Sequence, residues 1–337
     1  METLLDGMWD VEVDLVLWLQ SLGGWLEPPM RGASFLGSKG LFLLLLPLLF
    51  WCVHAGVGAR VFLMLMGSSV VNGLLKAIVV GARPYWLHPV VTSMSPEATF
   101  GMPSGHTQSA VAVWGYLAAK IRRRWIWPAA ATVIVLVALS RVYLGAHFLT
   151  DVVAGLAVGA ALLWLVLRYE RTLLRWWRQR ALGPQVGLAL AASLVPGVLT
   201  LSLQTLVRDG WTEPAEWTGT VPTDPPAATL EYVFMLGGGL FGAMVGFSVL
   251  AARGWYSAQG SLISRVTRYV LGMAGIVLIL VVAQVAVPGA DGAAAAVREY
   301  VLYTLIALWG ALAAPELFVR MGLATRPESA QPQGVTS

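Results

Sequence analysis

Long apolar runs separated by short polar segments dominate the chain. Each run is close to the roughly 20 residues that an α-helix needs to cross the hydrocarbon core of a bilayer. The pattern predicts an all-α, polytopic membrane helical bundle with about nine transmembrane helices. The expected spans are Leu36–Ala55, Ala59–Val80, Gly105–Ala119, Trp127–Leu144, Phe148–Leu167, Gln185–Leu206, Leu230–Ala252, Tyr269–Val287 and Tyr300–Met321.

Composition supports this assignment. Hydrophobic residues make up 57% and charged residues 12% of the 337 residues, and the mean hydropathy is +0.71. These values are typical of integral membrane proteins, and we expect no soluble domain. The N-terminal segment 1–35 carries acidic residues among Trp9, Val13 and Trp18, which predicts an interfacial amphipathic helix. The single cysteine, Cys52, excludes a disulfide within the chain.

Basic residues are distributed unevenly between the two sides of the predicted bundle. Most of the 22 lysines and arginines fall on one side when the spans alternate from an outer N-terminus, including the runs 120–124 and 168–180. The positive-inside rule makes that side cytoplasmic, and it explains the net charge of +4 without a nucleic-acid partner. The opposite side receives the acidic, proline-rich loop Asp209–Pro226, whose Trp211 and Trp217 fit an interfacial aromatic belt or, less simply, a lid.

Three short polar segments lie where hydrophobic helices should end, and all three fall on the outer side. Charged residues are costly in such places and usually mark function. Pro103-Ser104-Gly105-His106 begins a predicted helix, where free amides attract an anion and a glycine permits close approach. Lys76, Arg83 and Arg141 add three cations, which suit the oxygens of a phosphate group.

A histidine and an aspartate in the third segment suggest chemistry as well as binding. His147 and Asp151 are four residues apart at the start of a span, so both lie on one helical face. The carboxylate can then hold one ring nitrogen of the imidazole and leave the other nucleophilic. His106 would protonate a leaving oxygen. This set of residues indicates phosphoryl transfer through a phosphohistidine.

The three segments resemble the signature motifs of the type 2 phosphatidic acid phosphatase (PAP2) family. The matching patterns are Lys76-x6-Arg83-Pro84, Pro103-Ser104-Gly105-His106 and Ser140-Arg141-x5-His147-x3-Asp151. The resemblance implies a helical core similar to that of vanadium haloperoxidases and metal-independent hydrolysis of membrane lipid phosphates, with no cofactor and no metal site. It also implies site roles: His147 as nucleophile, Asp151 as its orienting partner and His106 as general acid, with phosphate held by Lys76, Arg83, Ser104, Gly105 and Arg141.

The resemblance also divides the chain. Segment 36–181 would be the catalytic core, 182–322 a C-terminal transmembrane extension and 323–337 a disordered tail. The extension resembles the larger branch of the family, which includes sphingosine-1-phosphate phosphatases and glucose-6-phosphatases. We expect an integral protein of a bacterial inner membrane, because the composition is rich in Ala, Arg and Gly, with its active site on the periplasmic or extracellular side.

Several alternatives stay open at this point. The same histidine chemistry serves a phosphotransferase that uses an alcohol acceptor in place of water, and a non-catalytic lipid-phosphate binding or translocating protein would keep the pocket alone. The substrate could be phosphatidic acid, a sphingoid-base phosphate, phosphatidylglycerol phosphate, a polyprenyl phosphate or diphosphate, or a soluble sugar phosphate. Glycines at 237–239, 242 and 246 favour close helix packing within the chain, with a homodimer contact or a lipid groove as the alternative.

Overall fold

The computed structural model describes residues 2–121, 123–286, 289 and 292–326. Within these ranges the chain is a helical bundle without a strand. Seven helices are long and apolar enough to cross a membrane, and eight if the bent pair Gly24–Phe35 and Lys39–Val53 forms one span. Every predicted span has a helical counterpart; the third, from Gly105, is continuous but shorter than the rest. Arg122, Val287 and the predicted tail beyond Arg326 lie outside the described residues.

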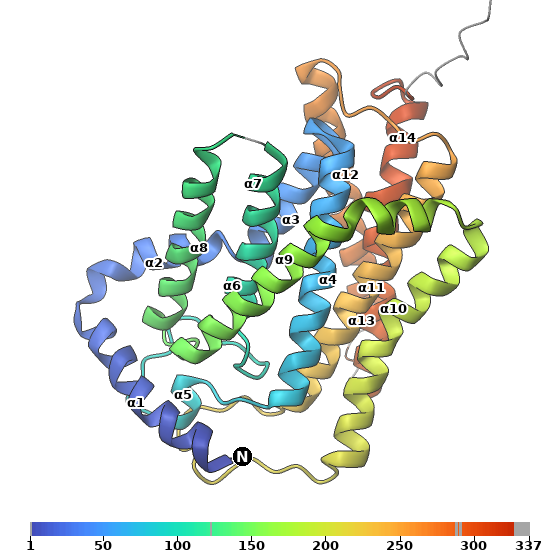
Figure 1. The fold of residues 1–337 in the computed structure, drawn as a ribbon. Helices are drawn as coiled ribbons and strands as arrows, with labels where there is room; N and C mark the ends of the chain where they lie inside the picture. The colour runs from blue at the N-terminus through green and yellow to red at the C-terminus, as the bar shows by residue number, and fades with distance from the viewer. Residues whose placement is uncertain (1, 122, 287–288, 290–291, 327–337) are drawn as a thin grey trace, which may run out of the picture.

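The first two N-terminal helices run along one flank of the core (Figure 1). Trp9, Val13 and Val16 of the first helix are buried in protein, and the Glu12 carboxylate accepts hydrogen bonds from the amide and hydroxyl groups of Thr150. The segment predicted to lie in the interface therefore also packs against the core and contacts the start of the fifth predicted span. These elements are α1 (Glu2–Ser21), α2 (Glu27–Phe35), α3 (Lys39–Pro47) and a π-helical continuation, Leu48–Val53.

The core that follows carries all three polar motifs. Its helices pack so that α6 contacts α4, α8 and α9, which places the second motif between the other two. His54 caps the N-terminus of α4 by accepting a hydrogen bond from the amide of Val57. The elements are α4 (Ala55–Val79), α5 (Pro84–Leu87), α6 (Gly105–Ala110), a π-helical turn at Val111–Gly115, α7 (Tyr116–Ile121), α8 (Ile126–Tyr143) and α9 (Leu149–Arg178).

The C-terminal extension is built around one central helix, α11, which packs against α13, α10 and α4. A side chain at Gly238 or Gly242 would collide with the backbone carbonyl of Tyr300 or Thr304, so the glycine face serves close packing against α13. The intrachain interpretation is confirmed for Gly238 and Gly242, whereas Gly239 lines a cavity. The elements are α10 (Leu182–Ser202), a π-helical turn at Leu203–Val207, α11 (Pro225–Ala252), α12 (Leu262–Ala286), α13 (Gly292–Leu308), a π-helical turn at Trp309–Ala313 and α14 (Ala314–Arg320).

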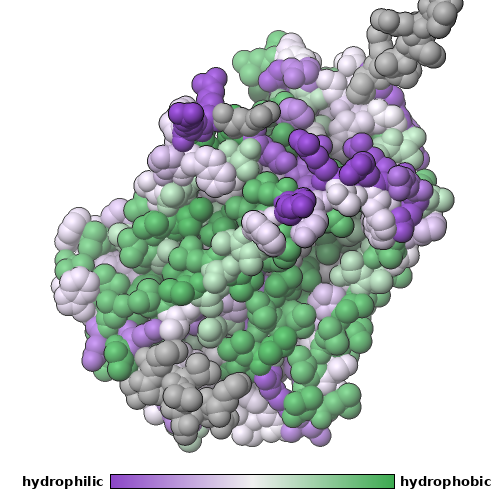
Figure 2. All heavy atoms as spheres, viewed as in Figure 1, coloured by the Kyte–Doolittle hydropathy of each residue, from purple (hydrophilic) through white to green (hydrophobic). Residues whose placement is uncertain are grey.

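The surface agrees with a membrane location. Figure 2 shows apolar atoms gathered in a broad band across the middle of the molecule, with hydrophilic side chains concentrated above it. Many large apolar side chains in this bundle are exposed, among them Val277 and Val281 of α12 and Trp164 of α9. In water such a surface would aggregate, whereas a bilayer solvates it. The protein is an integral membrane protein.

Candidate active site

The three polar motifs meet at one end of the bundle. The end of α4 supplies Lys76, the start of α5 follows Arg83, α6 begins after Ser104, and the turn between α8 and α9 carries His147. That turn is possible because Gly145 has φ of +68°, and a side chain there would collide with the carbonyl of Thr92, 2.6 Å from its Cβ position. Segments far apart in sequence thus form one polar site.

Two buried cations are held by main-chain carbonyls. Lys76 is 3% and Arg83 1% exposed. The Lys76 ammonium donates to the carbonyls of Phe100 and Gly101, and Arg83 donates to the carbonyls of Thr99 at 2.8 Å and Ala146 at 2.9 Å. Neutral carbonyls orient these cations without cancelling their charge, which leaves the charge available for an anion.

His147 lies between a carboxylate and a guanidinium. Its Nδ1 is 3.1 Å from Oδ2 of Asp151, and its Nε2 is 3.4 Å from Nη1 of Arg83. Asp151 is fixed because the same oxygen accepts a hydrogen bond from the Phe148 amide at the start of α9. Burial lowers the pKa of His147 well below its ordinary value, and Arg83 and Lys76 lower it further. The imidazole is therefore neutral at physiological pH, with Nε2 unprotonated when Asp151 accepts the Nδ1 proton.

A carboxylate that the motifs do not contain links two of their members. Glu97 accepts a hydrogen bond from Arg141 at 3.0 Å, and the same oxygen is 3.8 Å from Nδ1 of His106. Burial alone would raise the pKa of Glu97, but Arg83, His106 and Arg141 outweigh it and lower that pKa to about 2. Glu97 is thus a permanent anion beside His106. Sequence reasoning missed it, because an isolated glutamate in the 88–104 loop belongs to no recognisable spacing.

The second motif is held against α4 by a buried amide network. Asn72 donates to the carbonyl of Pro103 at 3.1 Å and to the side chain of Gln108 at 2.9 Å, and Gln108 donates to Ser68. The close approach also requires Gly105, whose Cβ position would lie 3.1 Å from Oδ1 of Asn72. This network fixes the start of α6, and neither amide was among the predicted site residues.

Apart from Asp151, the predicted catalytic and phosphate-binding residues fall into two groups. Lys76, Arg83, Gly105, His106 and His147 line one cavity. Ser104 and Arg141 are buried beside it and bind protein: the Ser104 hydroxyl pairs with Thr107 at 3.1 Å, and Arg141 contacts Ser34, Ser95 and Glu97. The structure brings all the motifs together but gives these two residues protein partners.

The contacts of the loop 209–226 correct the interpretation of its tryptophans. Trp217 is 8% exposed and packs on Trp86 with ring centroids 5.3 Å apart, and Trp211 packs on Phe100 at 5.9 Å. Gly219 also donates to the carbonyl of Trp86 at 2.7 Å. The aromatic-belt interpretation of Trp217 is wrong, because its ring is buried in protein. The loop instead supports Phe100, whose carbonyl holds Lys76 and Arg83.

Comparisons with known proteins identify both halves of the chain. The PAP2 superfamily model matches residues 57–175, and the model for the transmembrane extension of PAP2 superfamily phosphatases matches residues 234–326. Together they cover well over half of the chain. The first includes every motif residue from Lys76 to Asp151, and the second includes α12, α13 and most of α11.

Curated relatives come from several branches. The chain is 29% identical to phosphatidylglycerophosphatase B of Bacillus subtilis, covering 45% of this chain and 79% of that protein. It is 31% identical to human glucose-6-phosphatase 3 (59% and 65%) and 26% identical to mouse sphingosine-1-phosphate phosphatase 2 (40% and 39%). A crystal structure of a transmembrane PAP2 type phosphatidylglycerolphosphate phosphatase from Bacillus subtilis has 25% identity and a TM-score of 0.44, covering 49% of this chain and 87% of that chain.

Proposed function

Because the chain belongs to the PAP2 superfamily and carries its phosphatase extension, we propose that it is a membrane phosphatase that hydrolyses the phosphomonoester, or diphosphate, of a membrane lipid through a phosphohistidine. Family membership makes it a phosphoric monoester hydrolase. The observation that carries the proposal is the position of His147, buried between Asp151 and Arg83 on the wall of a cavity.

In the proposed reaction, Nε2 of His147 attacks phosphorus and the bond from phosphorus to the lipid oxygen breaks. His106 donates a proton to that oxygen, which leaves as the lipid alcohol. Water then attacks the phosphohistidine while His106 accepts its proton, and inorganic phosphate and free His147 result. Asp151 holds the Nδ1 proton throughout and stabilises the positive charge that develops on the ring.

The cations would stabilise the reacting phosphoryl group. Lys76 and Arg83 line the cavity, and among the described residues neither makes a direct contact with a carboxylate. Their positive charge therefore suits the negative equatorial oxygens of the transition state. Arg141 would act beside them while tied to Glu97. Ser104 and Gly105 would contribute through the start of α6, with Gly105 facing the cavity.

The apolar walls of the same cavity and the name of one relative support a lipid substrate. Below the polar end the lining is largely apolar, with Phe42, Leu46 and Leu65 among its members. The name of the Bacillus subtilis relative, phosphatidylglycerophosphatase B, also refers to a lipid phosphate. We therefore favour a lipid phosphate over a soluble sugar phosphate.

Phosphate release tests the proposal. Purified protein with EDTA should release inorganic phosphate from at least one member of a panel containing phosphatidic acid, sphingosine 1-phosphate, phosphatidylglycerol phosphate and a polyprenyl diphosphate, and His147→Ala should abolish it. Turnover that survives His147→Ala would overturn the mechanism. Turnover that appears only with an added alcohol acceptor would identify a phosphotransferase instead.

The proposed outer location of the active site has a separate test. Asp209 is exposed in the loop that packs beside the site, and Arg175 is exposed at the opposite end of the bundle, so each can be replaced by a cysteine that a reagent can reach. A membrane-impermeant thiol reagent added to intact cells should label the first variant and not the second, while the buried Cys52 stays unlabelled. The reverse pattern would place the active site in the cytoplasm.

A further inference from the structure

One cavity of about 340 Å³ joins the catalytic residues to the C-terminal extension. Its walls include His106 and His147 at one end and Phe62, Phe247 and Ile306 away from them. This volume lies within the range of pockets that hold one small ligand. Because the two ends are continuous, a molecule with its phosphate beside His147 has direct access to the apolar part.

Helix α4 lines the cavity with one stripe of residues that changes character along its length. The stripe follows helical spacing, so its members share one face. It starts with a cation and an amide at the catalytic end and ends with apolar side chains. In order from that end, the residues are Lys76, Asn72, Ser69, Met66, Leu65 and Phe62.

Helix α11 of the extension faces α4 with a matching stripe. Its polar member is Tyr232, near the catalytic end, and the rest are apolar or small. From Tyr232 to Phe247 the stripe extends about 22 Å along the helix axis, most of the roughly 30 Å thickness of a hydrocarbon core. Its residues are Tyr232, Met235, Leu236, Gly239, Ala243 and Phe247.

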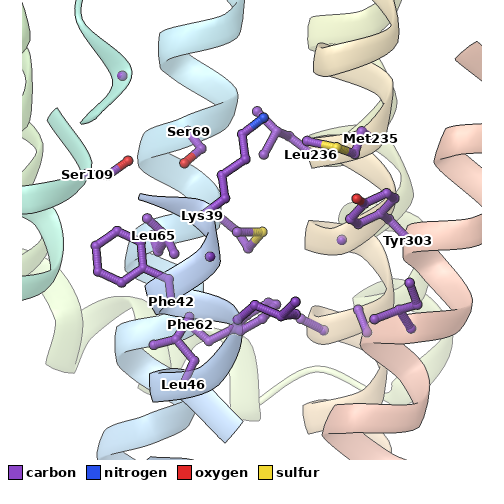
Figure 3. A pocket seen from close by; sticks show the side chains of 18 of the residues that line it. Lys39, Phe42, Leu46, Phe62, Leu65, Ser69, Ser109, Met235, Leu236 and Tyr303 are labelled. Carbon is purple, nitrogen blue, oxygen red and sulfur yellow. The ribbon is translucent and has the colours of Figure 1, made fainter. Parts of the chain in front are cut away.

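Lys39 marks the boundary between the polar and apolar parts. Figure 3 shows its side chain extending between Ser69 of α4 and Met235 and Leu236 of α11, with Phe42, Leu46 and Phe62 on the other side of its backbone. Its ammonium lies 4.2 Å from the ring centroid of Tyr232. Such a cation–π contact leaves donors free for an anion. The sequence from α3 onward repeats the gradient: Lys39 first, then Phe42, Leu46 and Phe50.

We propose that the extension forms part of the substrate site: the apolar chain of the phosphate ester lies between α3 and α4 on one side and α11 and α13 on the other, with its phosphate at His147. The inference rests on the proposed function and specifies its substrate class, an amphiphile with a long, narrow apolar tail. It also gives the extension a role in selectivity, which a purely structural extension would lack.

Adjacent glycines of α11 allow a focused test. Gly238 packs against the backbone of α13, whereas Gly239 faces the cavity, where the nearest atom to its Cβ position is Sδ of Met66 at 3.3 Å. Gly239→Leu should therefore fill the cavity without disturbing the α11–α13 contact. Phe62→Ala should do the opposite and deepen the apolar end. Ala274→Phe is the control, because Ala274 is exposed on α12 of the same extension.

The assay compares kcat/KM for lysophosphatidic acids of increasing acyl length and for glycerol 3-phosphate. The protein is held in lipid nanodiscs, because detergent alkyl chains would compete for the cavity. We expect kcat/KM to rise with chain length in the wild type and in Ala274→Phe. In Gly239→Leu the ratio of kcat/KM for the longest chain to that for the shortest chain should fall at least about tenfold, with glycerol 3-phosphate as the tail-free reference for each variant. Phe62→Ala should move the optimum to longer chains.

A binding measurement separates this inference from the proposed function. Alkylphosphonates of increasing length, which cannot be hydrolysed, should raise the Tm of the wild type in steps that grow with chain length, and Gly239→Leu should remove the growth. Phosphate release with no chain-length dependence, or the same profile in Gly239→Leu and wild type, overturns the inference while the phosphatase stands. Chain-dependent binding without turnover overturns the phosphatase while the tail site stands.

Discussion

The catalytic end of the cavity and the extension that walls its apolar end are held together in different ways. At the catalytic end, buried cations and carboxylates are fixed by hydrogen bonds, as with Arg83 and Lys76 on main-chain carbonyls and Asp151 on the Phe148 amide. In the extension, α11 meets α13 through glycines that allow backbone contact. The first region depends on the identity of polar atoms, and the second depends on shape.

The difference has an energetic cause. Lys76, Arg83 and Arg141 are buried beside the carboxylates of Asp151 and Glu97, and three cations against two carboxylates leave an excess of positive charge at this cluster, which is unfavourable until an anion binds. The charge of the catalytic end thus favours anion binding over stability, as the proposed phosphate site requires. Among the described residues, the glycine face of the extension carries no such cluster, so its packing can supply stability that the catalytic end gives up.

The largest expected effect follows from changing the geometry of a cation without its charge. Arg83→Lys keeps a positive charge but loses the fork that reaches Thr99, Ala146 and His147 together. We expect kcat to fall about 10²–10³-fold, the scale seen when one transition-state donor is removed. Steady-state phosphate release with the best substrate measures this loss.

Arg208→Lys is the matched control for that substitution. Arg208 also donates to two main-chain carbonyls, those of Ala77 and Ile78, at the end of α4. It does not line the catalytic cavity. Equal losses in the two variants would mean that Arg83 acts through the fold alone, and the comparison between the two regions would fail.

In the extension, added volume should cost stability rather than chemistry. Gly238→Leu forces a side chain against the carbonyl of Tyr300, and overpacking of this kind destabilises by about 1–3 kcal/mol. We expect a lower Tm but near-normal kcat for the fraction that remains folded. Gly187→Leu on α10, where nothing lies within 4 Å of the Cβ position, should leave Tm unchanged. A large loss of kcat at unchanged Tm would show that the α11–α13 contact affects catalysis.

The same contrast explains what could be predicted from sequence. The grouping of His147, Asp151, His106 and the motif cations at one end of the bundle could be predicted, because few residue types suit the proposed chemistry and their spacing follows helix geometry; their catalytic roles stay a prediction. The helical segments followed from apolar runs that the bilayer requires. The matched models confirm the family and its extension.

Other features depend on contacts between distant segments, which no local pattern encodes. Glu97 becomes part of the site only because the 88–104 loop folds back onto Arg141. Trp217 packs on Trp86, which lies far earlier in the chain. From the sequence alone, a tryptophan in a polar loop suggested an interfacial position. Gly239 differs from Gly238 only in the direction it faces, and a run of three glycines does not reveal that direction.

The smallest expected effect concerns Glu97, which connects the predicted motifs to the loop that the sequence left unassigned. Its pKa of about 2 is below the ordinary value of 4.5, so the folded state prefers the carboxylate. The resulting stabilisation is complete above about pH 4.5 and is lost as the pH falls toward 2.

Because the side chain of Glu97 is 31% exposed, we expect Glu97→Gln to cost only about 1 kcal/mol at pH 7. The Tm difference between wild type and Glu97→Gln should therefore shrink between pH 5 and pH 3, measured in one buffer series at constant ionic strength. A difference that stays constant over this range would mean that Glu97 contributes through packing and not through its charge, and the link between Arg141 and His106 would then be only steric.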